Sequence, residues 1–219
     1  MKKKGVALLY YGLIIYLLIF TVIILLFDKV SIFYFVNIHY SPFLDQLFYY
    51  LTVLGNGWVY LIIMLAMIWV SYRYVLMFFS ALVIKSIIVQ VLKHLIFPGV
   101  LRPQQFFENF SGFHRVNGVE LLNYNSFPSG HSATVFCIAV FLSLIIKKNH
   151  WTVIFIVLAI LTGYSRIYLG QHFSVDVYAG SIIGMATAFF SYRVFITKPA
   201  DKLNRISWID KKLSILKAG

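Results

Sequence analysis

The sequence predicts an all-α fold, a bundle of six membrane-spanning helices, and three observations lead to this prediction. Of the 219 residues, 61% are hydrophobic and only 12% are charged, whereas a soluble domain is nearer half apolar and a quarter charged. Six apolar segments approach the roughly 20 residues that a helix needs to cross the hydrocarbon core. The lysines and arginines also gather in alternate connections, as expected for the cytoplasmic side of a membrane protein.

The first segment, 6–27, follows Met1-Lys2-Lys3-Lys4 and resembles a signal peptide. Its apolar run is too long for one, and no small-residue cleavage pattern follows, so we interpret it as the first span. The remaining spans are expected at 57–71, 75–97, 131–147, 151–170 and 174–195. The apolar stretch 43–54 is either an interfacial helix or an extension of the second span, with a break at Gly55-Asn56-Gly57.

The distribution of positive charge sets the expected orientation. When the N-terminal lysines are placed inside the cell, six spans also place Arg73, Lys147-Lys148 and the tail after Arg193 inside. These positions account for most of the 19 lysines and arginines, as the positive-inside rule requires. Both termini are therefore expected in the cytoplasm, and the small size and this orientation favour a multi-pass protein of a bacterial inner membrane.

Composition also limits the organisation and the partners. A net charge of +12 is compatible with nucleic-acid binding, but the positive-inside pattern explains it better, so membrane lipids and no nucleic acid are the expected partners. The single cysteine, Cys137, excludes an internal disulfide framework. We expect one integral-membrane domain at 1–196, with a motif-bearing core at about 85–190. Residues 197–219 should form a basic cytoplasmic tail, either amphipathic on the inner leaflet or solvated.

Polar residues that packing does not explain are expected at a single membrane face, because each lies at or beyond the outer end of a predicted span. They include three cations, a Ser-Gly turn that opens the fourth span, two histidines and one carboxylate. The long outer connection from Pro98 to Gly130 joins several of them, and connections of this length are often functional. The set consists of Lys93, Arg102, Ser129, Gly130, His131, Arg166, His172 and Asp176.

Such a set is suited to binding a phosphate. The cations and the free N–H groups at a helix N-terminus attract phosphate oxygens, and arginine offers paired donors to them. Near neutral pH a histidine can act as a nucleophile or as a proton donor. His172 and Asp176 are four residues apart and share a helix face, so the carboxylate can hold one ring nitrogen and leave the other free to attack.

The order and spacing of two motifs resemble the phosphatidic acid phosphatase type 2 superfamily. These membrane lipid phosphatases share a site design with the vanadium haloperoxidases. The family's second signature is Pro-Ser-Gly-His, present as Pro128-Ser129-Gly130-His131. The third is Ser-Arg, five residues, His, three residues and Asp, present with matching spacing as Ser165-Arg166, His172 and Asp176. The resemblance covers roughly residues 85–190.

The first signature of the family departs from its usual spacing in this chain. The family has Lys, six residues and Arg-Pro, whereas here eight residues separate Lys93 from Arg102-Pro103. A turn at Pro98-Gly99 is expected to absorb the two additional residues, so that Lys93 still reaches the site. Lys85, deep in the third span, is either functional, as intramembrane charges often are, or extends toward the inner surface.

The resemblance implies a role for each residue of the set. His172 would attack phosphorus and form a phosphohistidine, Asp176 would orient His172, and His131 would protonate the leaving group and then activate water. The phosphate oxygens would be held by Lys93, Arg102, Ser129, Gly130 and Arg166. No metal and no cofactor is implied, since the cations replace the Mg²⁺ of other phosphoryl-transfer enzymes.

The function implied is an integral-membrane lipid phosphatase with its active site on the periplasmic or outer face. Undecaprenyl diphosphate, phosphatidylglycerophosphate, phosphatidic acid and lipid A phosphates all fit as substrates, and the loop 104–125 is expected to shape headgroup choice. Two alternatives remain open. One is a lipid phosphotransferase that passes the phosphoryl group to a hydroxyl. The other is a non-catalytic binding or transport protein with a metal or haem on its histidines, which the surrounding cations disfavour.

Overall fold

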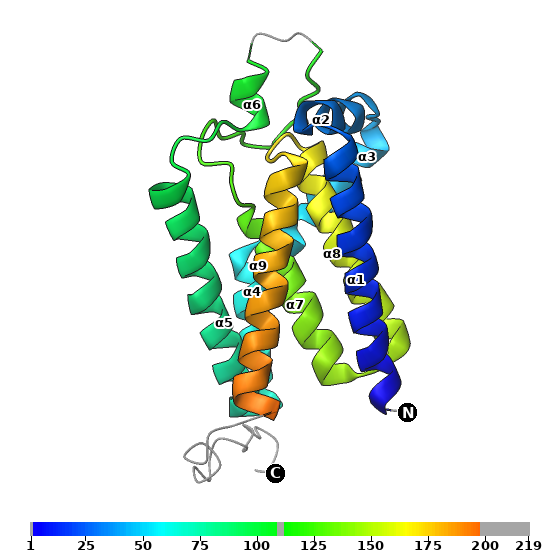
Figure 1. Cartoon of the computed structure of the whole chain (residues 1–219), viewed down its shortest axis with the longest axis vertical. Coiled ribbons are helices and arrows are strands. Elements are labelled where there is room, and N and C mark those ends of the chain that lie inside the picture. The colour runs from blue at the N-terminus through cyan, green and yellow to red at the C-terminus, as the bar shows by residue number, and fades with distance from the viewer. Residues whose placement is uncertain (1, 109–111, 198–219) are drawn as a thin grey trace, which may run out of the picture.

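The computed structural model describes residues 2–108 and 112–197, and within them there are helices and irregular connections but no strand. The predicted all-α fold is therefore confirmed for this part of the chain, while the predicted tail, from residue 198 on, lies outside it. The start of α1 and the end of α9 lie at the same end of the bundle (Figure 1). The helices are α1 (Lys2–Leu26), α2 (Lys29–Ile38), α3 (Pro42–Leu51), α4 (Gly57–Ala66), α5 (Tyr72–Val91), α6 (Pro103–Phe106), α7 (Gly130–Ile146), α8 (Asn149–Tyr168) and α9 (Ser174–Tyr192).

Four to five candidate spans are present in the described residues, compared with the six expected. Four helical segments are long and apolar enough to cross a membrane, namely Val6–Leu26, Tyr72–Ile96, Asn149–Tyr168 and Ser174–Thr197. A bent pair, Pro42–Gly55 and Gly57–Trp69, makes a fifth when it is taken as one span, with an angle of 53° at the break. The break lies at the predicted position, where the side chain of Asn56 accepts a hydrogen bond from Trp58 N at 3.2 Å and caps α4.

The remaining predicted span corresponds to α7, which has only 17 residues. A helix of this length extends about 26 Å, just short of a hydrocarbon core of about 30 Å. All residues from Ser132 to Phe141 are buried, and α8 and α9 pack against α7 along its length. An apolar helix without an exposed face is a central helix. Because its neighbours surround it, α7 does not need to match the membrane thickness by itself.

Two glycines bring α9 into backbone contact with α7. A Cβ atom at Gly180 would lie 2.3 Å from Ser129 O, and one at Gly184 would lie 2.2 Å from Ala133 O. Helices in membranes approach closely where small residues are spaced four apart, because burial of apolar surface gives little drive to association there. This contact fixes the start of α7, which carries Ser129, Gly130 and His131, against the start of α9, which carries Asp176.

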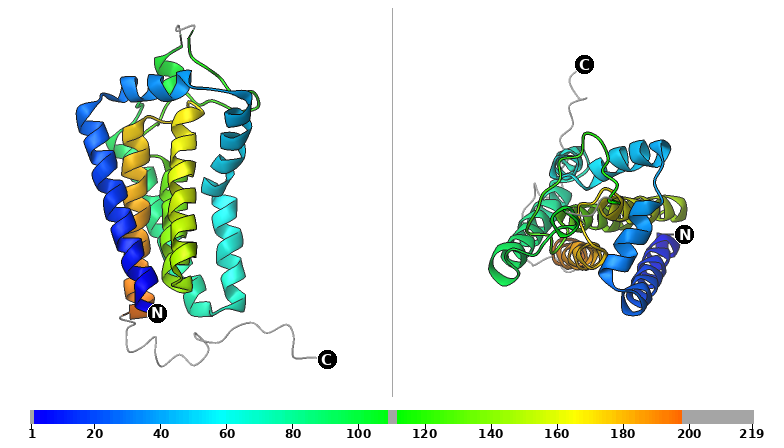
Figure 2. Two further views of the ribbon diagram at one scale, coloured as in Figure 1. Left: turned by 90° about the vertical axis from the view of Figure 1, so that its right-hand side faces the viewer. Right: turned by 90° about the horizontal axis from the view of Figure 1, so that it is seen from above.

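Helix α2 lies in a segment for which the apolar pattern predicts no helix, and it runs across one end of the bundle (Figure 2). The carboxylate of Asp28 caps its first turn by accepting hydrogen bonds from Val30 N (2.9 Å) and Ser31 N (3.0 Å). The outer connection is fastened to α2 through Asn37, which accepts from His114 N at 2.8 Å and donates to His114 O at 3.0 Å. The His114 ring in turn lies 2.9 Å from the carboxylate of Asp45 in α3.

We expect Gly184→Ala to lower the free energy of unfolding by about 1–3 kcal/mol. The added methyl overlaps the carbonyl of Ala133, which cannot move without separating α7 from α9. The better helix propensity of alanine, worth about 1 kcal/mol, does not offset this overlap. Thermal unfolding in detergent measures the effect. Gly57→Ala is the matched control, since a Cβ there meets no atom within 4 Å. Equal stability of the two variants would contradict the close contact.

Candidate active site

The structure brings the predicted site residues together at the end of the bundle that α2 and the outer connection cover. They come from the last turn of the α5 span, the outer connection, the start of α7, the end of α8 and the segment that leads into α9. Hydrogen bonds and charge–charge interactions connect them. Their convergence agrees with the geometry expected from the sequence, while their chemical roles remain proposals.

His172 lies at the centre of this group and is 2% exposed. It lies in the short connection between α8 and α9, where its backbone N–H donates to Arg166 O at 3.1 Å. Its ring nitrogen Nε2 is 3.5 Å from Arg102 Nη1, and Nδ1 is 3.5 Å from Asp176 Oδ2. Since a guanidinium only donates hydrogen bonds, Nε2 is assigned the lone pair and Nδ1 the proton. This tautomer leaves Nε2 available as a nucleophile.

Burial lowers the pKa of His172 well below its usual range, and the positive charges of Arg102, Arg166 and Lys93 act in the same direction. The imidazole is therefore neutral at physiological pH in the absence of a bound anion. Only the neutral ring has the lone pair that nucleophilic attack requires. The cations thus favour an anion nearby and keep the imidazole of His172 unprotonated.

Arg102 is held by backbone carbonyl groups. Its Nε donates to Tyr124 O at 2.9 Å, Nη1 donates to Gln171 O at 3.0 Å, and Nη2 lies 3.4 Å from Asn125 O. The residue is 6% exposed. Carbonyl acceptors fix the orientation of the guanidinium without neutralising its charge, so the positive charge remains available to an anion.

Lys93 reaches the site despite the two additional residues in its signature. The α5 span ends in a π-helical turn, Leu92–Ile96, and Gly99 adopts a left-handed conformation with φ of 72° in the expected turn. Lys93 Nζ then donates to Asn125 O at 2.8 Å, the same carbonyl that Arg102 approaches. Asn125, itself at a φ of 56°, was not singled out from the sequence, because its contribution is a backbone carbonyl in a loop.

Arg166 is 7% exposed and connects the site to the broken helix pair. Its Nη1 donates to Thr52 Oγ1 at 2.7 Å, in the turn Thr52–Gly55 that precedes the break. Its Nε is buried and has no hydrogen-bond partner among the described residues. A buried donor without a partner costs about 1–3 kcal/mol, and a bound phosphate oxygen is an acceptor that would remove this cost.

The Pro-Ser-Gly-His signature forms the N-terminus of α7. Ser129 is the N-cap, with its Oγ 3.3 Å from Ser132 N, and its own N–H donates to Asp176 O at 2.9 Å. His131 follows in the first turn and lies within electrostatic reach of Arg166 and His172. Gly55 packs against it so closely that a Cβ there would be 2.8 Å from His131 Cβ. The break in the helix pair therefore leaves room for His131.

Lys85 is not part of this group. It is 5% exposed, donates to Thr134 Oγ1 of α7 at 2.6 Å, and lies over the ring of Tyr60 at 4.8 Å. The side chain therefore points into the bundle, and extension toward the inner surface is ruled out by this geometry. Among the residues that the structure describes, no group of three or more His, Cys, Asp or Glu side chains is arranged to hold a metal ion.

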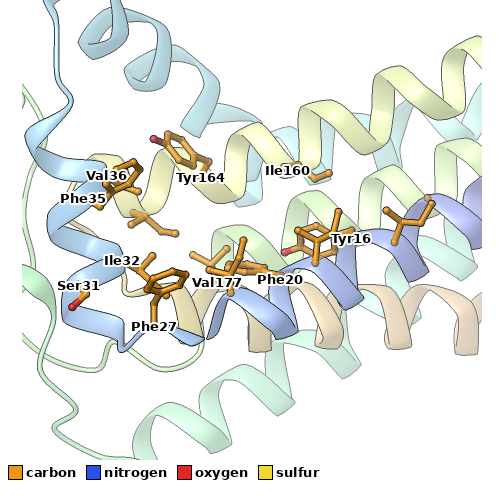
Figure 3. Close-up of a pocket in the computed structure, with 15 residues that line it drawn as sticks. Tyr16, Phe20, Phe27, Ser31, Ile32, Phe35, Val36, Ile160, Tyr164 and Val177 are labelled. Carbon is orange, nitrogen blue, oxygen red and sulfur yellow. The ribbon is translucent and has the colours of Figure 1, made fainter. Parts of the chain in front are cut away.

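A cavity of about 910 Å³ lies beside the site, between α1, α2, α8 and α9. Its labelled side chains face one another across the space between these helices (Figure 3). The lining is almost entirely apolar, and hydroxyl groups come only from Ser31, Tyr16 and Tyr164. Ile167 and Val177 belong to the lining and directly follow Arg166 and Asp176 in the chain. The cavity therefore extends to the level of the site and suits hydrocarbon.

The lowered pKa of His172 predicts a pH-dependent stability. The unfolded chain protonates His172 below about pH 6.5, while the folded protein keeps it neutral. The stability contributed by the neutral ring is therefore complete above about pH 6.5 and is lost below it, by up to about 1.4 kcal/mol per pH unit. Thermal unfolding at about pH 7.5 and about pH 5.5 should show a larger loss for the wild type than for His172→Asn. An identical loss in both proteins would exclude this coupling.

Comparison with curated proteins gives partial matches to membrane phosphatases and a permease. The chain is 40% identical over 91 residues to the bacitracin transport permease protein BcrC of Bacillus licheniformis, covering 42% of this chain and 40% of that protein. It is 38% identical over 81 residues to the undecaprenyl-diphosphatase of Sulfolobus acidocaldarius, covering 37% and 39%. The matched segments thus span about two fifths of the length of these relatives.

Two crystal structures resemble a larger part of the fold. The LpxE of Aquifex aeolicus is similar with a TM-score of 0.67 at 29% identity, over 75% of this chain and 94% of the other. A transmembrane PAP2-type phosphatidylglycerolphosphate phosphatase of Bacillus subtilis is similar with a TM-score of 0.60 at 27% identity, over 86% and 94%. The family model of the PAP2 superfamily matches residues 74–199, more than half of the chain and all eight predicted site residues. This protein therefore belongs to the PAP2 superfamily.

Proposed function

We propose that this protein is a metal-independent phosphatase of the membrane that hydrolyses a phosphomonoester or diphosphate lipid. The observation that carries the proposal is the position of a buried, neutral His172 with its Nε2 beside Arg102 and among the charges of Lys93 and Arg166. A free lone pair surrounded by cations is arranged to attack the phosphorus of an anion. The phosphatases among the relatives support the same reaction class.

The proposed reaction proceeds in two displacements. His172 Nε2 forms a bond to phosphorus while the bond from phosphorus to the lipid oxygen breaks. His131, which takes up a proton when the anionic substrate binds, donates that proton to the leaving oxygen. His131 then accepts a proton from water as the water oxygen attacks the phosphohistidine. The P–N bond breaks, phosphate leaves, and both histidines return to their starting states. Throughout, Lys93, Arg102, Arg166 and the N-terminus of α7 offset the charge on the phosphoryl oxygens.

Two features support a lipid as the substrate. The apolar cavity between α1 and α8 extends to the level of Arg166 and Asp176 and is large enough for part of a hydrocarbon chain. Undecaprenyl diphosphate and phosphatidylglycerophosphate, the substrates in the names of two similar proteins, both carry such chains next to a phosphate. The proposal therefore extends to an amphiphile whose chain lies along α1 while its phosphate meets His172.

Six crossings and an outward-facing site belong to the same proposal. Counting α7 as a crossing within the bundle gives an even number, which agrees with the start of α1 and the end of α9 lying at one end (Figure 1). The N-terminal lysines and Lys147-Lys148 mark that end as cytoplasmic by their charge. His172 and the outer connection then face the periplasm or the outside of the cell.

We expect His172→Ala to lower phosphate release from the preferred lipid phosphate by on the order of 10³-fold or more, because the attacking atom is removed. A screen across lipid phosphates in detergent, with and without a chelator, measures it. His150→Ala is the matched control, since His150 is exposed in the first turn of α8, whereas Arg166 of the site lies in the last turn of the same helix. Unchanged release by His172→Ala would refute the proposed nucleophile, and loss of wild-type activity with chelator would refute metal independence.

The orientation is tested by labelling Asn117→Cys and Asn149→Cys in spheroplasts with a membrane-impermeant maleimide. Both asparagines are exposed, one in the outer connection and one at the start of α8. The native Cys137 is buried and contributes little background. We expect position 117 to react in closed spheroplasts and position 149 only after lysis. The opposite pattern would place the site in the cytoplasm.

A further inference from the structure

Ser126 lies outside all three signatures, yet it contacts two members of the proposed catalytic group. Its side chain is 0% exposed. Its hydroxyl donates a hydrogen bond to Asp176 Oδ2 and lies 3.4 Å from His172 Nδ1. The backbone N–H of Ser126 donates to Val100 O at 3.0 Å, so two parts of the outer connection hold the hydroxyl in the site.

Asp176 alone does not fix the ring of His172 in this structure. The distance from Asp176 Oδ2 to His172 Nδ1 is 3.5 Å and that from Ser126 Oγ is 3.4 Å. Both oxygens therefore lie just beyond the roughly 2.7–3.2 Å of an ordinary N–H···O hydrogen bond, and the ring nitrogen faces the two of them together. Asp176 Oδ2 already accepts from the Ser126 hydroxyl and from Phe173 N at 2.9 Å. Because the Ser126 proton is directed to Asp176, a lone pair of its oxygen remains for the proton on Nδ1. The hydroxyl thus lies between the carboxylate and the imidazole as a shared partner.

We propose that Ser126 is a positioning residue for His172 and acts together with Asp176. It holds the carboxylate in place and gives the Nδ1 proton a second acceptor, so that Nε2 remains unprotonated and directed at the phosphate. When Nε2 bonds to phosphorus, the ring gains positive charge and its Nδ1–H bond becomes more polar. Ser126 and Asp176 then stabilise that charge, the proton stays on Nδ1, and Ser126 forms no covalent bond. This inference rests on the proposed function.

Ser126→Ala removes the hydroxyl and should lower kcat for phosphate release by about 10- to 100-fold, since hydrogen bonds to charged groups are worth that much in rate. KM should change by less than about threefold, because no phosphate contact is removed. Rapid-quench trapping of the phosphohistidine should show a slower formation step. Ser181→Ala is the matched control, because Ser181 is equally buried in α9 and its hydroxyl donates to Tyr178 O of the same helix, at 2.7 Å.

A double-mutant cycle with Asp176→Asn separates positioning from a general loss of stability. If Ser126 acts through Asp176 and His172, Ser126→Ala has little further effect on kcat once Asp176 is replaced, and the two effects are not additive. Fully additive effects, or a kcat for Ser126→Ala equal to that of Ser181→Ala, would overturn the inference. Ser126→Thr keeps the hydroxyl and should retain more activity than Ser126→Ala, and the reverse order would also overturn it.

A wild-type protein that releases no phosphate from any lipid phosphate would instead overturn the proposed function, and this inference with it.

Discussion

The site depends on the confinement of three cations around the buried ring of His172. Lys93, Arg102 and Arg166 all act electrostatically on His172, and Asp176 is the acid in contact with that ring. Like charges in a poorly solvated region repel one another strongly, so they persist only where the fold holds them. Backbone carbonyls of the outer connection hold Lys93 and Arg102, and Thr52 holds Arg166. A phosphate bound among these cations would relieve the repulsion.

The features of the site that depend on local spacing could be predicted from the sequence. His172 and Asp176 do lie beside each other as the sequence predicts, but not on one helix face, because His172 precedes α9, which begins at Ser174. A Ser-Gly pair before an apolar run is typical of a helix N-terminus. The break at Asn56 followed in the same way from a Gly-Asn-Gly turn. The position of Lys93 could also be predicted despite the two additional residues, because Pro98-Gly99 indicates a turn, and Gly99 adopts the left-handed conformation of one. Helix caps, turns and short spacings depend on the residues at those positions, so the sequence indicates them directly.

Other features could not be predicted, because they arise from tertiary contacts. Asn125 contributes a carbonyl to two cations and Thr52 a hydroxyl to Arg166, and neither residue type is distinctive in a loop or a helical turn. The π-helical turn Leu92–Ile96 shifts the end of α5 without a change in apolar pattern. Helix α7 was expected to behave as a full span, but its burial on all sides frees it from the length that lipid contact imposes. Apolar content alone does not distinguish lipid-facing from buried helices.

The close contact between α7 and α9 links packing to chemistry at Ser129. Its carbonyl lies against Gly180, and its N–H donates to the carbonyl of Asp176. The backbone of α9 thus holds the Ser129 turn on two sides, within one helical turn of the carboxylate that faces His172. Because Gly180 lacks a side chain, the two helix axes approach closely enough for both contacts to form. The small residues of α9 therefore set the distance between the turn proposed to bind phosphate and the proposed nucleophile, which a catalytic displacement requires to be fixed.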